Sequence, residues 1–288
     1  MRVSLLWILC YLVLAPFLGG LLDGCDRKIS ARMQGRIGPP ILQPFYDVQK
    51  LFNKQTIAVR RAQAAFLLVY MIMMIFTGCM FYGGTDILMC FFVLSTAATF
   101  LYFAAVVTNS PYSTIGASRE LIQMMTYEPA VLFTCVGFYL ANGTFTVSSI
   151  VKSGTSSILY LPGFFFAFVF ILTIKMRKSP FDTSASHHAH QELVKGLTTE
   201  FGAKNLAFFT ITEWYENIFL LGVVGLFIVN RHPISWVIAV IVVLAVYFLE
   251  ILIDNTSARV KQETMLKLTW TVTLLSAGIN TLVLMLVR

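Results

Sequence analysis

Long uncharged runs alternate with short polar stretches along the chain. Four runs of about twenty residues carry no charge, at 3–22, 62–82, 87–107 and 268–287. A helix of this length crosses the roughly 30 Å hydrocarbon layer of a bilayer. Four more segments are apolar but shorter or interrupted by charges, at 115–141, 159–175, 206–229 and 233–253. The pattern predicts an all-α polytopic bundle of about eight transmembrane helices, forming a single membrane domain over residues 1–288.

The first run also has to be distinguished from a targeting signal. Arg2 precedes it, and no small-residue A-x-A pattern closes it before the polar stretch begins. These features favour a retained helix over a cleaved signal peptide. The composition agrees with a membrane protein, because the chain is 57% hydrophobic and only 12% charged, whereas soluble domains carry about 25% charged residues. A soluble globular protein is thereby excluded.

The basic residues indicate how the helices are oriented. The chain has 21 Lys and Arg and a net charge of +7, and 17 of these residues fall after the first, third, fifth and seventh predicted helices. Because cytoplasmic loops are enriched in Lys and Arg, we expect a cell-membrane protein with both termini outside. The two long loops, at about 23–61 and 176–205, then form a cytoplasmic docking surface. Topology explains the positive charge better than nucleic-acid binding does.

The cysteines give no sign of a redox centre on this chain. They are odd in number and no C-x-x-C pair occurs; the five are Cys10, Cys25, Cys79, Cys90 and Cys135. This argues against a zinc site, an iron–sulfur cluster or a disulfide framework. No dinucleotide-binding or phosphate-binding motif occurs either. We therefore predict no catalytic residue, no metal ligand and no cofactor on the chain itself.

Acidic residues inside the apolar segments are the candidates for chemistry, since ionisable groups in a membrane are costly to bury. Glu213 and Glu216 stand at i and i+3 on one helical face, with no basic residue in their own segment. They are predicted to relay protons, or alternatively to lie near the interface and pair with an Arg elsewhere. Glu128 precedes Pro129, which can kink a helix and admit water.

Two other charged groups have a simpler interpretation. Arg119 and Glu120 on the cytoplasmic side are interpreted equally well as a structural or a functional ion pair. Glu250 and Asp254, at i and i+4, are followed by basic residues at 259 and 261, and we expect salt bridges at the interface.

The two long loops contain further candidates. Three histidines, His187, His188 and His190, accompany Glu192 and Glu200 in the second loop. They could relay protons, and their spacing does not match a zinc site. The first loop is basic and includes the sequence from Arg36 to Pro40, where Gly38 and Pro39 indicate a turn. Anionic lipid or a partner subunit would explain this charge equally well.

Several motifs occur in an order that resembles a known family. They are Arg36-Ile37-Gly38-Pro39, Ile115-Gly116-Ala117-Ser118-Arg119 with Tyr127-Glu128, Pro180-Phe181-Asp182, Gln191-Glu192-Leu193-Val194, Thr199-Glu200-Phe201, and Glu213. Together they resemble the membrane subunit of respiratory complex I that lies beside the quinone site. The histidines between 183 and 192, where quinone-reducing members have glutamates, make the chain more similar to the corresponding subunit of Ech-type energy-converting nickel-iron hydrogenases.

The resemblance implies a membrane anchor that couples redox chemistry between ferredoxin and protons to ion movement. Its partners would be the hydrogenase small and large subunits, an iron–sulfur subunit and an antiporter-like membrane subunit, with the nickel-iron centre and the iron–sulfur clusters on those partners. The implied proton pathway comprises Glu128, Glu200, Glu213, Asp182 and Glu192, to which position or spacing adds Glu216, His188 and His190. Partner docking is assigned to Arg27, Arg36, Gly38, Pro39 and Arg119.

Three other functions remain open from the sequence. One is a quinone-site subunit of a complex I-like dehydrogenase, or a subunit of a formate hydrogenlyase. Another is an independent secondary transporter, and the third is a passive scaffold whose glutamates are structural. The ion could be a proton or sodium, because carboxylates bind both.

Overall fold

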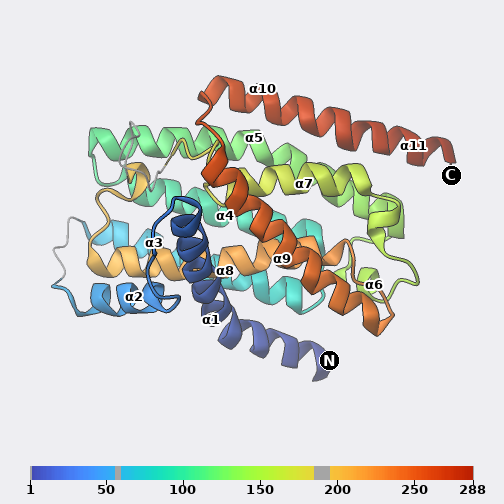
Figure 1. Cartoon of the computed structure of the whole chain (residues 1–288), viewed down its shortest axis with the longest axis horizontal. Helices are drawn as coiled ribbons and strands as arrows, with labels where there is room; N and C mark the ends of the chain where they lie inside the picture. The colour runs from blue at the N-terminus through green and yellow to red at the C-terminus, as the bar shows by residue number, and fades with distance from the viewer. Residues whose placement is uncertain (1, 56–59, 185–194, 288) are drawn as a thin grey trace.

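The computed structural model describes residues 2–55, 60–184 and 195–287, and within these ranges the chain is helical without a β-strand (Figure 1). In chain order the helices are α1 (Arg2–Met33), α2 (Gln43–Asn53), α3 (Arg61–Tyr82), α4 (Ile87–Val106), α5 (Pro111–Asn142), α6 (Val147–Val151), α7 (Pro162–Lys175), α8 (Ala203–Leu226), α9 (Pro233–Thr256), α10 (Gln262–Thr273) and α11 (Ile279–Val287). Two 3₁₀ turns, η1 (Ser157–Leu159) and η2 (Gly196–Thr198), precede α7 and α8, and a π turn, η3 (Leu274–Gly278), joins α10 to α11.

The predicted all-α polytopic bundle is confirmed. In the described part of the chain, six helical segments are long and apolar enough to cross a membrane: α1, α3, α4, α5, α9 and the continuous α10–α11. The shorter apolar α7 and the acid-containing α8 correspond to the two other predicted segments. The protein is therefore a multi-pass membrane protein.

Several helices extend beyond their apolar runs. Helix α1 continues to Met33, and α2 lies inside the region predicted as the first long loop. Polar residues end a hydrophobic run without ending a helix, and here Asp23 and Arg27 form an i,i+4 ion pair at 3.0 Å on the extended part of α1. Helix α5 likewise continues through Pro129. The predicted loops are accordingly shorter than the polar stretches suggest.

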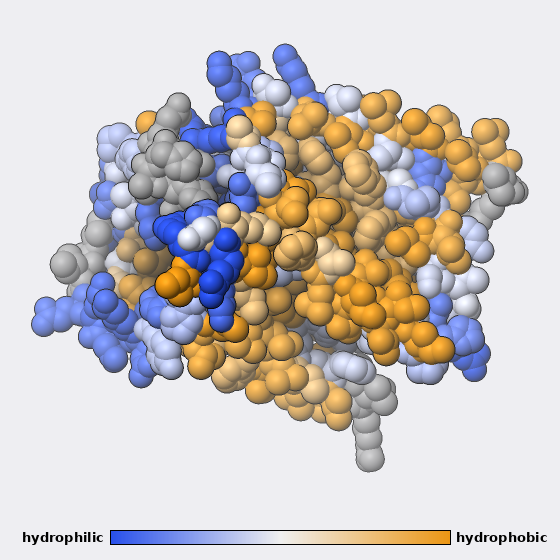
Figure 2. All heavy atoms as spheres, viewed as in Figure 1, coloured by the Kyte–Doolittle hydropathy of each residue, from blue (hydrophilic) through white to orange (hydrophobic). Residues whose placement is uncertain are grey.

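The core lies among α3, α4, α5, α7 and α8. Its largest fully buried side chains are mostly aromatic and include Tyr70, Phe91, Phe138, Phe164 and Phe219. Helices α1 and α9 instead display many exposed apolar side chains, as lipid-facing helices do. Figure 2 shows hydrophobic residues over the face formed by these two helices and hydrophilic residues at the end of the molecule that carries α2.

The opposite end of the bundle is closed by short connections. Asp86 and Thr146 form an isolated β-bridge, and the Arg231 backbone N–H donates to the Ser153 carbonyl at 3.1 Å. The two ends therefore differ: one has compact turns, and the other has α2, η2 and the segment that follows α7.

Candidate functional site

The site begins where α7 ends. This helix has 14 residues and is about 21 Å long at 1.5 Å per residue, too short to cross the roughly 30 Å hydrocarbon layer. The basic residues at its end therefore stay inside the protein: Lys175, Arg177 and Lys178 are only 8–9% exposed. Buried charges require partners, and acidic residues of the neighbouring helices supply them.

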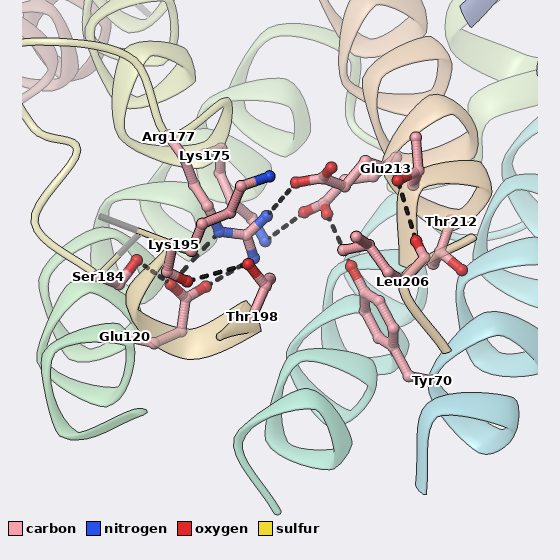
Figure 3. Close-up of polar contacts among 12 residues, drawn as sticks. Tyr70, Glu120, Lys175, Arg177, Ser184, Lys195, Thr198, Leu206, Thr212 and Glu213 are labelled. Atoms are coloured by element: carbon pink, nitrogen blue, oxygen red, sulfur yellow. Dashed lines mark hydrogen bonds and ion pairs between the residues drawn. The ribbon is translucent and has the colours of Figure 1, made fainter. Parts of the chain in front are cut away.

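Arg177 joins α5 to α8. Its Nη2 lies 2.8 Å from Glu120 Oε1 on α5, and its Nη1 lies 2.9 Å from Glu213 Oε1 on α8. Figure 3 shows the guanidinium between these two carboxylates. The Ser184 hydroxyl donates a further hydrogen bond to Glu120 at 2.5 Å. The guanidinium fork suits this bridging position because it presents several donors in one plane.

Lys175 forms the second buried ion pair. Its Nζ lies 2.8 Å from Glu216 Oε1 on α8 and 4.6 Å from the centre of the Tyr127 ring on α5. The Tyr70 hydroxyl on α3 donates to the other Glu216 oxygen at 3.2 Å. Glu216 is thus held by contacts from both α7 and α3.

The three ion pairs of Arg177 and Lys175 form one group, which we call the buried charge network: Glu120, Lys175, Arg177, Glu213 and Glu216. Glu213 and Glu216 lie three residues apart on α8, so the network runs along one face of that helix. It contains three carboxyl groups and two cations. With every group ionised its charge would be −1, and one bound proton would make it neutral.

A close backbone contact between α5 and η2 positions Ser184, which donates to Glu120 of the buried charge network. A Cβ on Gly116 of α5 would lie 2.4 Å from the Leu197 nitrogen in η2, so only glycine permits this approach. The Leu197 N–H donates to the Ser184 carbonyl at 3.2 Å. The Gln123 side chain on α5 donates to the Phe181 carbonyl. These contacts hold the segment after α7 against α5.

The sequence-predicted proton residues are distributed unevenly around this network. Glu213 and Glu216 belong to it. Glu128 is partly exposed and lines a small recess between α4 and α5 with Ser95 and Tyr127. Glu200 is partly exposed just before α8, where its carbonyl accepts a hydrogen bond from Gln63 at 3.2 Å.

The other residues of the predicted proton pathway lie in the second long loop, of which the structure describes only a part. Asp182 is buried, with Oδ1 3.9 Å from Arg259 Nε. Glu192, His188 and His190, and with them His187, lie outside the described residues.

The predicted docking residues lie at the end that carries α2. Arg27 pairs with Asp23 and, at 2.7 Å, with Asp47 of α2. Burial alone would raise the pKa of Asp47, but hydrogen bonds from Gln43 and Arg27 lower it below its usual value. Arg27 therefore fixes α2 to α1 within the chain.

The other four docking residues lie in the first loop and on α5. Arg36 is exposed and donates to the Gln34 side chain. Gly38 has a φ of +72°, as the predicted turn before Pro39 requires. The Arg119 side chain donates to the Thr183 carbonyl at 3.4 Å.

Two sequence interpretations need correction. Glu250 does not form the expected salt bridge: it is fully buried, and in the described part of the chain neither of its oxygens has a hydrogen-bond partner. The reason is that the segment after α7 packs over this face of α9, where Lys178 lies 4.9 Å from the centre of the Tyr247 ring, one helical turn before Glu250. Asp254 accepts a hydrogen bond from the Ser179 backbone N–H at 2.8 Å. The second correction concerns Glu120, which was interpreted as half of an ion pair with Arg119. Its carboxylate pairs with Arg177, a residue that the sequence analysis placed in the second cytoplasmic loop.

Sequence reasoning missed Lys175, Arg177 and Tyr70 as members or contacts of the site. In the sequence both cations stand at the end of a predicted transmembrane segment, where basic residues are expected at the cytoplasmic surface. Tyr70 lies within an ordinary apolar run and gave no signal. Among the described residues, no group of three or more His, Cys, Asp or Glu could hold a metal ion.

The fold and the network define a class: a polytopic membrane protein that carries linked buried ion pairs between its helices. Within this class, the family described as NADH dehydrogenase matches residues 5–285, and the chain belongs to that family. The predicted resemblance to the complex I and hydrogenase membrane subunits is thereby confirmed.

Individual relatives come from both kinds of complex. Hydrogenase-4 component C of Escherichia coli (strain K12) is 27% identical over 282 residues, covering 88% of each chain. A subunit of the NADH-quinone oxidoreductase of Rhodospirillum rubrum is 25% identical over 298 residues, covering 91% of this chain and 88% of the relative. A chain from the structure of the membrane-bound sulfane sulfur reductase, an archaeal respiratory membrane complex, shares the fold, with a TM-score of 0.84, 23% identity, and coverage of 98% of this chain and 99% of that one.

Proposed function

We propose that the protein is the membrane-anchoring and ion-translocating subunit of a multisubunit energy-converting hydrogenase. In this complex, redox chemistry between ferredoxin and hydrogen would drive protons or sodium ions across the membrane. The observation that carries the proposal is the buried charge network, whose three carboxyl groups outnumber its two cations. The similarity to hydrogenase-4 component C supports a hydrogenase as the complex to which the chain belongs.

The network suits proton transfer for a chemical reason. The side chain of Glu213 is 26% exposed, whereas those of Glu120 and Glu216 are only 6% and 5% exposed. A proton that reaches Glu213 can therefore pass towards the interior, since Glu213 and Glu216 share one helical face. Proton uptake by one carboxyl would weaken its ion pair and free the cation for a neighbouring carboxylate.

The remaining proton residues extend this pathway in both directions. We assign Asp182, Glu192, Glu200, His188 and His190 to entry from the cytoplasm. Glu128 continues the pathway outward, since it follows Tyr127, whose ring lies against Lys175. The adjoining antiporter-like membrane subunit would receive the ion from there.

The partners would dock on the end of the bundle that carries α2. Arg27, Arg36, Gly38, Pro39 and Arg119 belong to this surface, which we assign to the cytoplasmic side of the cell membrane, with both termini outside. The small and large hydrogenase subunits and an iron–sulfur subunit would bind there and carry the nickel-iron centre and the clusters. This chain would be a non-redox subunit.

The test is Glu213→Gln in the purified complex, reconstituted into vesicles. Hydrogen turnover and ion uptake are measured in parallel. We expect ion uptake per turnover to fall by at least about tenfold, less than the roughly 10²–10⁴-fold that a positioned proton-transfer group typically contributes, while turnover with detergent-solubilised complex persists. The control is Glu263→Gln, since Glu263 is exposed at the start of α10. Unchanged uptake with Glu213→Gln would indicate a passive scaffold.

A quinone-reducing complex is the second candidate, because NADH-quinone oxidoreductase subunits of several organisms are 25–27% identical to the chain. Purification of the tagged chain in mild detergent distinguishes the candidates. Nickel and hydrogenase subunits in the eluate would support the hydrogenase. Bound quinone would indicate a complex I-like dehydrogenase, an attached formate dehydrogenase would indicate a formate hydrogenlyase, and a lone metal-free chain would favour a secondary transporter.

A further inference from the structure

A second group of ionisable side chains lies between α1 and α9. Lys178 Nζ lies 2.8 Å from Asp26 Oδ2 on α1 and 4.9 Å from the centre of the Tyr247 ring on α9. Glu250 and Asp254 follow Tyr247 by one and two helical turns, so the three residues share the face of α9 towards Lys178. The neighbouring cations Arg177 and Lys178 therefore pair with different acids. Arg177 pairs with the carboxylates of the buried charge network, and Lys178 pairs with Asp26.

Glu250 is the unusual member of this second group. Its exposed fraction is 0%, and within the described ranges neither carboxyl oxygen has a hydrogen-bond partner. Burial of an ionised carboxylate without a partner costs far more free energy than burial of the neutral acid. The surroundings thus favour the protonated acid as long as Lys178 remains with Asp26.

The charges around Glu250 can change this preference. Lys178 attracts the ionised form of Glu250, and Asp254 repels it. Asp254 is itself engaged by the Ser179 backbone N–H. On α1, Asp26 accepts a hydrogen bond from the Ser30 hydroxyl at 3.2 Å, and its side chain is 21% exposed. The Lys178 ammonium therefore pairs with a water-accessible acid, Asp26, and lies against the Tyr247 ring, one helical turn from the buried acid Glu250.

We propose that Glu250 is a proton-carrying site that exchanges its proton with Asp26 as Lys178 moves between them. In the first state Glu250 is protonated and the Lys178 ammonium pairs with the Asp26 carboxylate. In the second state the proton is on Asp26 and the ammonium pairs with the Glu250 carboxylate. Both states contain one proton, one ammonium and one carboxylate, so the net charge of the three groups is zero in each. Asp26 then exchanges its proton with water.

This site is separate from the buried charge network and uses different helices. Its use as a step in ion transport rests on the proposed function, whereas the proton on Glu250 does not. A direct measurement of the proton on Glu250 can therefore support or contradict this proposal, whatever the measurement of coupled transport shows.

The test is infrared difference spectroscopy on the purified complex that contains the full chain. A protonated carboxylic acid in an apolar site gives a carbonyl band that an ionised carboxylate lacks. We expect Glu250→Gln to remove one such band and Glu263→Gln to retain it. An unchanged band in an assembled Glu250→Gln complex would overturn the proposal.

Two further variants test the exchange. Asp26→Asn releases Lys178 towards Glu250, so we expect the Glu250 band to lose most of its intensity at the same pH. Lys178→Met removes the cation, so we expect the full band to persist to a more alkaline pH than in the parent. A Glu250 band that keeps its intensity in Asp26→Asn would contradict the exchange, even if Glu250→Gln prevented assembly. Coupled transport measured on the same complexes reports separately on the proposed function.

Discussion

Lys175 Nζ and Glu216 Oε1 lie 2.8 Å apart, and both side chains are almost fully buried. The pair joins the last residue of α7 to the middle of α8. The two charges of this pair can lie deep in an apolar bundle because each has the opposite charge within contact distance. Removal of one partner leaves the other buried and uncompensated.

We therefore predict that Lys175→Met lowers the stability of the complex by about 3–5 kcal/mol, the usual cost of breaking a buried ion pair. The double variant Lys175→Met with Glu216→Gln should be less destabilised than the sum of the two single variants, since both charges are then absent. Thermal unfolding midpoints of the three variants measure this coupling. Strict additivity would show that the two groups do not interact.

A second prediction concerns sidedness. Lys50 on α2 and Lys152 after α6 are both exposed and lie at opposite ends of the bundle. If the Lys- and Arg-rich end is cytoplasmic, a membrane-impermeant maleimide added to right-side-out vesicles should label Lys152→Cys and not Lys50→Cys. Inverted vesicles should give the reverse pattern. The parent chain, with its five native cysteines, provides the background.

A third prediction follows from Asp47. Hydrogen bonds from Gln43 and Arg27 outweigh burial and lower its pKa in the folded state. A lowered folded-state pKa means that Asp47 contributes stability above its unfolded pKa of about 3.9, and that this contribution is lost as the pH falls through the folded-state pKa.

The loss on acidification should be small, because Asp47 is substantially exposed. The unfolding midpoint is measured from neutral pH to about pH 3.5, a range that includes the unfolded pKa of Asp47. Over this range the midpoint should fall less steeply in Asp47→Asn than in the parent. Arg27→Met should weaken the same dependence. If the unfolding midpoints of all three proteins fell equally on acidification, the contact between Arg27 and Asp47 would make no contribution to stability.

The sequence predicted much of the fold because the length of an apolar run is a direct signal of a membrane-spanning helix. It also exposed Glu213 and Glu216, since a carboxylate inside an apolar run stands out. The partners Lys175 and Arg177 were harder to recognise. Basic residues after a span are expected at the cytoplasmic surface, and only the packing of the short α7 shows that these two are buried.

The same reasoning explains the error at Glu250. Its neighbour Asp254 and the basic residues that follow resembled a surface salt-bridge cluster in the sequence. Whether such a helix end lies at the surface depends on what packs against it, and the segment after α7 covers this face of α9. Glu128 was selected because it precedes Pro129 in an apolar segment, and Glu200 through the family resemblance; that both lie outside the network could not be inferred from spacing alone.

The last prediction concerns Gly116, which lets η2 approach α5. In Gly116→Ala the new Cβ would lie 2.4 Å from the Leu197 nitrogen, so η2 must move, at a cost of about 1–3 kcal/mol for overpacking. Because the Leu197 N–H holds the Ser184 carbonyl, the displacement should also disturb the hydrogen bond from Ser184 to Glu120. We expect ion uptake per hydrogen turnover to fall more than turnover itself.

The control is Gly154→Ala, since a Cβ at Gly154 would meet no atom within 4 Å. It should leave both ion uptake and stability at the parent level. Ser184→Ala removes only the hydroxyl that binds Glu120 and separates the network effect from the steric one. If Gly116→Ala lowered stability while ion uptake per turnover stayed at the parent value in both Gly116→Ala and Ser184→Ala, the contact would serve packing alone, and the Ser184 end of the network would have no part in transport.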